Sequence, residues 1–226
     1  MRKADFDRSI RASFNSLFEI GLTDYRLFPN PRSLITNDEF KKIALDSQST
    51  YLDTFLSGSR LKHYNFACED FSFFQFSHFN SGGKISLRYA FYPNPFSKEL
   101  SDLLADDISE EEDETVIDQL IDECETNFDI PPIRFDYEPD SYSEFCHPAA
   151  HLHIGHFQNN RWAANKILTP LSFSLLITKH YFPSFWSKSD DSRSSNFTNN
   201  LEKKLSDEIS INERLGAELF TEHESL

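Results

Sequence analysis

The chain has 226 residues, of which 38% are hydrophobic and 15% aromatic, enough to bury one substantial core. Its formal net charge of -15 is concentrated between residues 99 and 125, which contain thirteen acidic and no basic residues. The rest of the chain carries 24 acidic and 22 basic residues. The body is therefore close to neutral, and its charge does not exclude nucleic-acid binding at another surface.

The cysteine spacing and the first residues of the chain indicate which cellular compartment to expect. Cys68, Cys124 and Cys146 lie far apart and form no CxxC pair, a pattern that indicates neither a disulfide framework nor a thiolate zinc site. The first residues lack the apolar stretch of a signal peptide, and no window approaches the roughly 18 apolar residues of a spanning helix. We expect a cytoplasmic protein with no membrane association.

The amino-terminal part of the chain predicts two helices. Apolar residues recur at helical spacing from residue 5 to residue 20 and predict an amphipathic helix. A turn at residues 29–31 separates it from a second predicted helix, which begins near Asn37 and ends near Gly58. We expect these two helices to pack together.

The hydrophobic period changes to two between residues 61 and 91. Two alternating runs flank Asn80-Ser-Gly-Gly83 and predict a β-hairpin. Strand patterns return at residues 133–137 and 151–154, and we expect both to join the same sheet. Thr169-Pro170 then predicts the start of a buried helix that continues to residue 182.

These elements predict the fold class and the domain organisation. We expect an α+β protein: an antiparallel sheet of about five strands, covered by helices from both ends of the chain. Residues 1–186 form the single domain, with an acidic helical insertion at residues 97–126. Residues 187–200 are predicted to be a polar linker, and residues 201–226 a last amphipathic helix.

A group of histidines is the strongest indication of a functional site. Four of the eight histidines lie within ten residues, a density that core packing rarely produces. Imidazole titrates near neutral pH and also ligates metals. The four are His147, His151, His153 and His156.

Strand parity places part of this group on one face of the sheet. Because alternate side chains of a strand share a face, Arg134 should lie with Asp136, and His151 with His153. If the intervening apolar residues face the core, these four side chains line one polar surface across neighbouring strands. They are our main catalytic candidates, since they combine imidazoles with a carboxylate that can orient them.

Three nearby residues are weaker candidates. Tyr137 and His147 are secondary catalytic candidates. His156 is a weaker metal-ligand candidate. Gly155 shifts it by one residue from the alternation of His151 and His153, so its side chain points to the opposite face of the strand unless Gly155 forms a bulge.

Three interpretations of this surface remain open. In the first, the histidines are structural and bond to Asp136, Glu138 or Glu144. In the second, Arg134 stabilises a phosphate and two histidines move protons, without any cofactor. In the third, the His-x-His pair binds a divalent metal, and a carboxylate or another histidine (His147 or His156) completes the ligand set. The sequence alone does not decide between them.

The histidine run can be compared with two hydrolase signatures, and it matches neither in full. The segment from His151 to His156 resembles the histidine-triad signature of nucleotide hydrolases, in which histidines alternate with apolar residues. It departs from that signature at the third histidine, which Gly155 displaces. None of the four histidines is followed by the x-Thr or x-Ser of two-histidine phosphoesterases.

A longer resemblance covers roughly residues 130 to 185. Its blocks resemble an uncharacterised family of bacterial proteins known as a domain of unknown function. The resemblance implies a bacterial cytosolic protein, with a loose association with anti-phage defence, and assigns no catalytic residue. The blocks are Arg134-Phe-Asp136-Tyr137, His147-Pro148-Ala-Ala-His151-Leu-His153-Ile-Gly155, Leu168-Thr169-Pro170 and Tyr181-Phe-Pro183.

Two functional hypotheses follow. The first is an accessory or interaction subunit of a bacterial anti-phage defence system, which docks a larger protein effector through the acidic segment or the terminal helices. The alternative is a histidine-dependent nuclease or phosphodiesterase, such as a toxin-like RNase, with its site on the surface from Arg134 to His156. Nucleic acid would be reached through the partner or through that surface.

Overall fold

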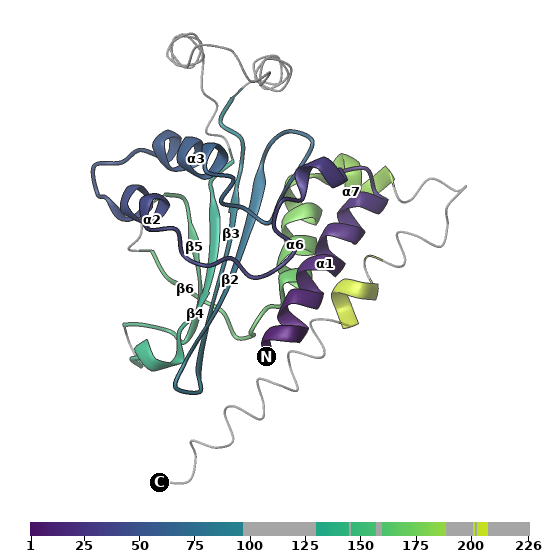
Figure 1. Cartoon of the computed structure of the whole chain (residues 1–226). Coiled ribbons are helices and arrows are strands. Elements are labelled where there is room, and N and C mark those ends of the chain that lie inside the picture. The colour runs from purple at the N-terminus through teal and green to yellow at the C-terminus, as the bar shows by residue number, and fades with distance from the viewer. Residues whose placement is uncertain (97–129, 145, 157–159, 189–200, 202, 208–226) are drawn as a thin grey trace.

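The computed structural model describes residues 1–96, 130–144, 146–156, 160–188, 201 and 203–207 (Figure 1). The predicted acidic insertion, most of the predicted linker and most of the predicted last helix lie outside these residues. Of the last helix, residues 201 and 203–207 are described and are helical. Leu201 and Leu205 lie in one buried cluster with Leu171 and Leu175.

The centre of the fold is an antiparallel sheet of six strands in the order β1-β2-β3-β4-β5-β6. This confirms the predicted α+β class. The two outermost strands have only two residues each and are too short for an alternating pattern to be visible in the sequence. The strands are β1 (Phe66–Ala67), β2 (Phe73–Ser81), β3 (Lys84–Tyr92), β4 (Ile133–Tyr137), β5 (Ala150–Ile154) and β6 (Trp162–Ala163).

The predicted hairpin joins β2 to β3. Gly82 and Gly83 connect the strands with φ angles of +61° and +88°, in the left-handed region that glycine adopts without steric cost. Two such residues form the tight turn that matches the twist of paired strands. The turn sets the register in which Ser77 lies opposite Arg88.

One face of the sheet packs against two helices, α1 (Lys3–Glu19) and α6 (Pro170–Tyr181) (Figure 1). α6 begins at a capping box between Thr169 and Ser172, which satisfies free amide groups of its first turn. A short helix, α7 (Pro183–Lys188), follows it. The core between these layers is largely aromatic and includes Phe6, Phe14, Phe66, Phe74, Phe76, Tyr89, Phe91, Phe135 and Phe173.

Two shorter helices, α2 (Asp38–Leu45) and α3 (Tyr51–Arg60), lie on the other side of the sheet (Figure 1). The prediction of one continuous helix from Asn37 to Gly58 was therefore wrong. The first helix ends before Asp46, whose side chain accepts a hydrogen bond from the backbone N–H of Gln48. A capping box at Thr50 begins the second helix.

The predicted pairing of the first two helices was also wrong. α1 packs against α6, whereas α2 packs against α3. α1 packs against the apolar face of the sheet, where its buried Phe6 ring contacts Tyr89 with ring centres 5.8 Å apart. α3 instead packs on the opposite face, where the rings of Phe55 and Phe73 lie 5.2 Å apart.

The remaining described elements are two short 3-10 helices, η1 (Tyr25–Leu27) and η2 (Pro139–Ser141). Among the residues that the structure describes, no helix has both the length and the apolar character needed to cross a membrane.

Candidate functional site

Five polar side chains converge on the face of the sheet that α1 and α6 leave uncovered. Strand register places Arg88 of β3, Asp136 of β4 and His151 of β5 in one row across the strands. The next row pairs Arg134 with His153. Directly opposed residues share a face, so the structure brings together the four main candidates of the sequence analysis and adds Arg88. We call these five residues the polar cluster.

Asp136 is the centre of the cluster. Its Oδ1 accepts a 2.9 Å bond from Arg88 Nε, and its Oδ2 accepts a 3.0 Å bond from Arg134 Nε. Burial raises the pKa of this carboxyl group, but contact with His153 and with the two guanidinium groups outweighs burial and holds the pKa well below its usual range. Asp136 is therefore an anion at neutral pH.

His151 has one ring nitrogen engaged. Its Nδ1 lies 2.8 Å from the carbonyl oxygen of Pro148, and because a carbonyl oxygen only accepts, Nδ1 must carry the proton. Burial lowers the pKa of the ring below its ordinary value of 6.5. At neutral pH the ring is consequently uncharged, and the lone pair of Nε2 is free to accept a proton or to bind a cation.

His153 is the least satisfied group of the cluster. The residue is 3% exposed, and its Nε2 lies 3.4 Å from Asp136 Oδ2 without forming a hydrogen bond. Its Nδ1 is also buried without a hydrogen-bond partner among the described residues. Buried polar atoms of this kind are rare and usually indicate a bound water, an ion or a functional role.

The cluster becomes more exposed toward Glu138 and His147. Glu138 Oε1 accepts a 3.3 Å bond from Arg88 Nη2, and its Oε2 lies 4.0 Å from His147 Nε2. The His147 ring is 5.0 Å from that of His151. The side chains of Arg88, Glu138 and His147 are 43%, 31% and 21% exposed, against 3% for Asp136, so this end is the accessible one.

The structure does not bring two of the weaker candidates into the cluster. Tyr137 pairs with Leu87 and Ala150 on the apolar face. His156 leaves the strand after Gly155, whose φ of +87° is in the left-handed region. The Nε2 of His156 instead bonds to the carbonyl oxygen of Ser49, at 2.9 Å.

Arg88 was not among the site residues predicted from the sequence. The available signal was a charged residue within a run of apolar ones, between Leu87 and Tyr89. Its place beside Asp136 depends on the pairing of β3 with β4, and the two residues are separated by 48 positions in the chain.

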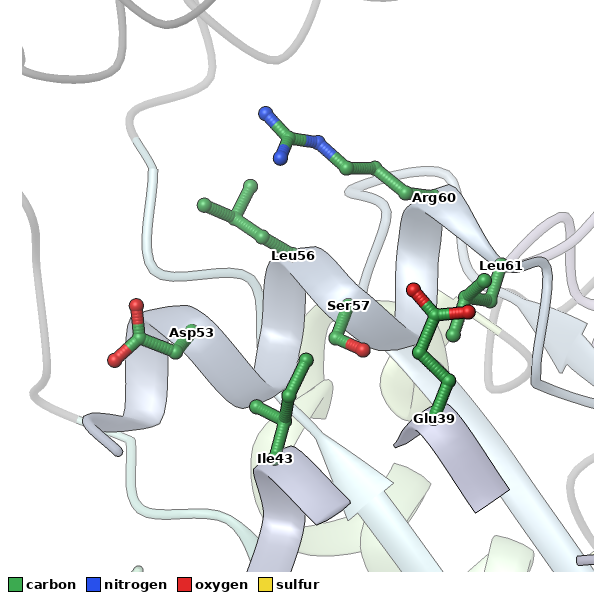
Figure 2. Close-up of a pocket in the computed structure, with 7 residues that line it drawn as sticks. All are labelled: Glu39, Ile43, Asp53, Leu56, Ser57, Arg60 and Leu61. Carbon is green, nitrogen blue, oxygen red and sulfur yellow. The ribbon is translucent and has the colours of Figure 1, made fainter. Parts of the chain in front are cut away.

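A separate hollow lies between α2 and α3 and encloses about 240 Å³ (Figure 2). No residue of the polar cluster lines this hollow. Its open, mixed lining gives no further indication of a ligand. The lining residues are Glu39, Ile43, Asp53, Leu56, Ser57, Arg60 and Leu61.

The cluster supports two kinds of chemistry. Guanidinium groups beside an uncharged imidazole can bind an anion and accept a proton. Alternatively, Asp136, His151 and His153 each offer one donor atom, and these atoms all lie within 4.8 Å of one another, an arrangement that can hold a metal ion.

Comparison with known proteins places the chain in a family. A family model described as an uncharacterized conserved protein, DUF2290, matches residues 26–219. The chain belongs to the DUF2290 family. No curated protein and no solved structure matches the DUF2290 chain. The matched range contains the whole polar cluster, whereas α1 precedes it, and the expected likeness to an uncharacterised family is confirmed.

Proposed function

We propose that the DUF2290 protein is a histidine-dependent nuclease or phosphodiesterase whose site is the polar cluster. The observation that carries this proposal is the convergence of two guanidinium groups, an anionic carboxylate and an uncharged imidazole on one sheet face. Hydrolysis of a phosphodiester needs donors for the phosphoryl oxygens and a group that activates the attacking water. The cluster contains both.

Arg134 is the proposed phosphate-binding group. Its Nε bonds to Asp136, while its two terminal nitrogens have no hydrogen-bond partner among the described residues. A guanidinium group held in this way presents two parallel donors, which suit two oxygens of a phosphate. Asp136 thus acts as a positioning residue for Arg134.

His151 is the proposed water-activating residue. The bond from Nδ1 to Pro148 fixes the orientation of the ring, and the lowered pKa keeps Nε2 unprotonated at neutral pH. An imidazole in this state can activate a water molecule for attack on phosphorus. His153 lies beside it, with ring centres 4.9 Å apart.

The variant His151→Asn tests this function. The asparagine amide can replace Nδ1 in the bond to Pro148, but it has no counterpart of Nε2. We expect hydrolysis of bis(p-nitrophenyl) phosphate, or of single-stranded RNA or DNA, to fall by about 10²- to 10⁴-fold. The melting temperature should stay close to that of the wild type.

His180→Asn serves as the control, because His180 is exposed at the end of α6. Its activity should equal that of the wild type. The proposal fails if the wild-type protein hydrolyses none of these substrates, or if His151→Asn retains full activity. A loss of several kcal/mol of stability in His151→Asn would instead favour the structural interpretation of the histidines.

A second function is favoured by the charge of residues 99–125. We propose that the protein could alternatively serve as an accessory subunit of a bacterial anti-phage defence system, docking a larger effector. A segment with thirteen acidic and no basic residues suits a basic partner surface, since complementary charge speeds association and selects partners.

Deleting residues 99–125 tests this second function. The partner to use is the protein encoded beside this chain, and binding is measured by calorimetry at low and high salt. We expect the deletion to weaken binding and to remove most of its salt dependence. Unchanged affinity and salt dependence would rule out docking through this segment.

A further inference from the structure

We infer that Asp136, His151 and His153 bind one divalent first-row transition-metal cation, with His151 contributing Nε2. This inference deepens the proposed function, on which it rests for its chemistry, and it changes the role of His151. As a ligand, His151 Nε2 would hold the cation that activates the water and would not itself accept the proton. The test needs no substrate. Of the ligands that the sequence allowed beside the His-x-His pair, this inference selects a carboxylate, that of Asp136, in place of His147 or His156. Two imidazoles and one carboxylate suit Zn²⁺, Fe²⁺ and neighbouring cations.

The distances between the donor atoms match a shared cation. Ligand atoms about 2.1 Å from a tetrahedral cation lie about 3.4 Å apart. His153 Nε2 and Asp136 Oδ2 are already 3.4 Å apart, which is too long for a good hydrogen bond. One donor atom each of Asp136, His151 and His153 lies within 4.8 Å of the others, so these atoms need to approach by at most about 1.4 Å.

The unsatisfied ring of His153 is the second, independent observation. Its Nε2 is buried, lies 3.4 Å from Asp136 Oδ2 and has no hydrogen-bond partner among the described residues. Leaving such an atom without a partner exposes the fold to the desolvation cost of the buried group. A cation bound between His153 and Asp136 would satisfy this nitrogen.

His151 has the hydrogen bond that metal-binding histidines commonly make. Such histidines usually donate their other ring N–H to a carbonyl or carboxylate, which fixes the tautomer and the ring orientation. The bond from His151 Nδ1 to the carbonyl oxygen of Pro148 does this. The lone pair of Nε2 is thereby left for the cation.

A bound cation would also suit the proposed anionic substrate. Two guanidinium groups, from Arg88 and Arg134, are matched by two carboxylates, from Asp136 and Glu138. These four side chains together therefore carry no net charge and do not attract an anionic phosphodiester over a distance. A bound divalent cation would add a charge of +2 to them, which favours such a substrate.

Asp136 can bind the cation while it remains bonded to arginine. Each carboxylate oxygen has two lone pairs, and the only hydrogen bond that Oδ2 accepts in the described structure comes from Arg134 Nε. Three protein ligands leave coordination positions open for water, whose pKa a cation of this kind lowers to about 7. The bound water would lose a proton to solvent, the resulting hydroxide would form the new P–O bond as the ester P–O bond breaks, and the leaving oxygen would take up a proton from solvent.

The test measures metal binding to the full chain, purified without a histidine tag and stripped with a chelator. After dialysis against Zn²⁺, elemental analysis should find one Zn²⁺ per wild-type chain. Affinity should fall by more than about tenfold in His151→Asn and in His153→Leu. His156→Gln is the matched control and should bind as the wild type does, because His156 contacts Ser49 outside the cluster.

Thermal melting distinguishes a metal ligand from a structural histidine. Added Zn²⁺ should raise the melting temperature of the wild type and not that of the two ligand variants. Without metal, His153→Leu should melt no lower than the wild type, because it removes two unsatisfied nitrogens. If His153→Leu does not fold, His151→Asn, which keeps the bond to Pro148, decides the test.

The inference is overturned if the wild type binds no Zn²⁺, or if the double variant His151→Asn/His153→Leu still binds one equivalent. Phosphodiester hydrolysis by the metal-free protein would also overturn it, and would leave the proposed function standing. If the protein binds Zn²⁺ but hydrolyses no phosphodiester, the metal site is supported and the proposed nuclease or phosphodiesterase function is refuted.

Discussion

Replacing Asp136 by alanine is expected to lower the free energy of unfolding by about 3 kcal/mol. Asp136 is buried and accepts bonds from both Arg88 and Arg134, so its loss leaves two guanidinium groups without their main partner. We place the effect at the lower end of the range for broken buried pairs, because Arg88 retains 43% exposure. Urea denaturation monitored by circular dichroism measures it.

Two comparisons show whether unpaired charge is the cause. Glu138→Gln removes a more exposed partner of Arg88 and should cost less than about 1 kcal/mol. The triple variant Asp136→Leu/Arg88→Met/Arg134→Met removes all three charges and should recover most of the stability lost in Asp136→Ala. A loss below about 1 kcal/mol in Asp136→Ala would show that the network does not support the fold.

Phe76→Ala is expected to destabilise the protein by about 3–5 kcal/mol. Phe76 is fully buried on the apolar face, where its ring lies 5.5 Å from Tyr89 and 6.2 Å from Phe173. Truncation leaves a cavity between β2, β3 and α6 that these large, rigid rings cannot close. The free energy of unfolding from urea titration measures the loss.

Phe79→Ala is the matched control for this prediction. Phe79 lies on the same strand, but it points to the opposite face and is 38% exposed. Its truncation should cost less than about 1 kcal/mol. Equal losses for the two variants would contradict an aromatic core confined to the α1–α6 side of the sheet.

The two faces of the sheet have different roles in this protein. The aromatic face provides most of the buried apolar area and therefore most of the stability. The opposite face is covered by α3 near Phe73 and carries the polar cluster further along the strands. A rigid aromatic layer behind the cluster holds β4 and β5 in place, which keeps its side chains in a defined geometry.

Local patterns in the sequence determined much of this arrangement. The period-two alternation of residues 133–137 and 151–154 placed Arg134 with Asp136, and His151 with His153. The glycine pair at residues 82 and 83 located the hairpin, and Thr169-Pro170 located the start of α6. Each of these features depends only on residues a few positions apart, so the sequence shows it directly.

The tertiary structure alone decided the rest. It placed Arg88 beside Asp136, directed His156 to Ser49, and put α1 and α2 on opposite faces of the sheet. These results depend on strand register and on packing between segments far apart in the chain, such as the 107 positions between Ser49 and His156. Hydrophobic periodicity shows which side of an element is apolar, but not which distant partner covers it. The chemistry of the site therefore follows from its neighbours across the strands, which only the folded chain brings together.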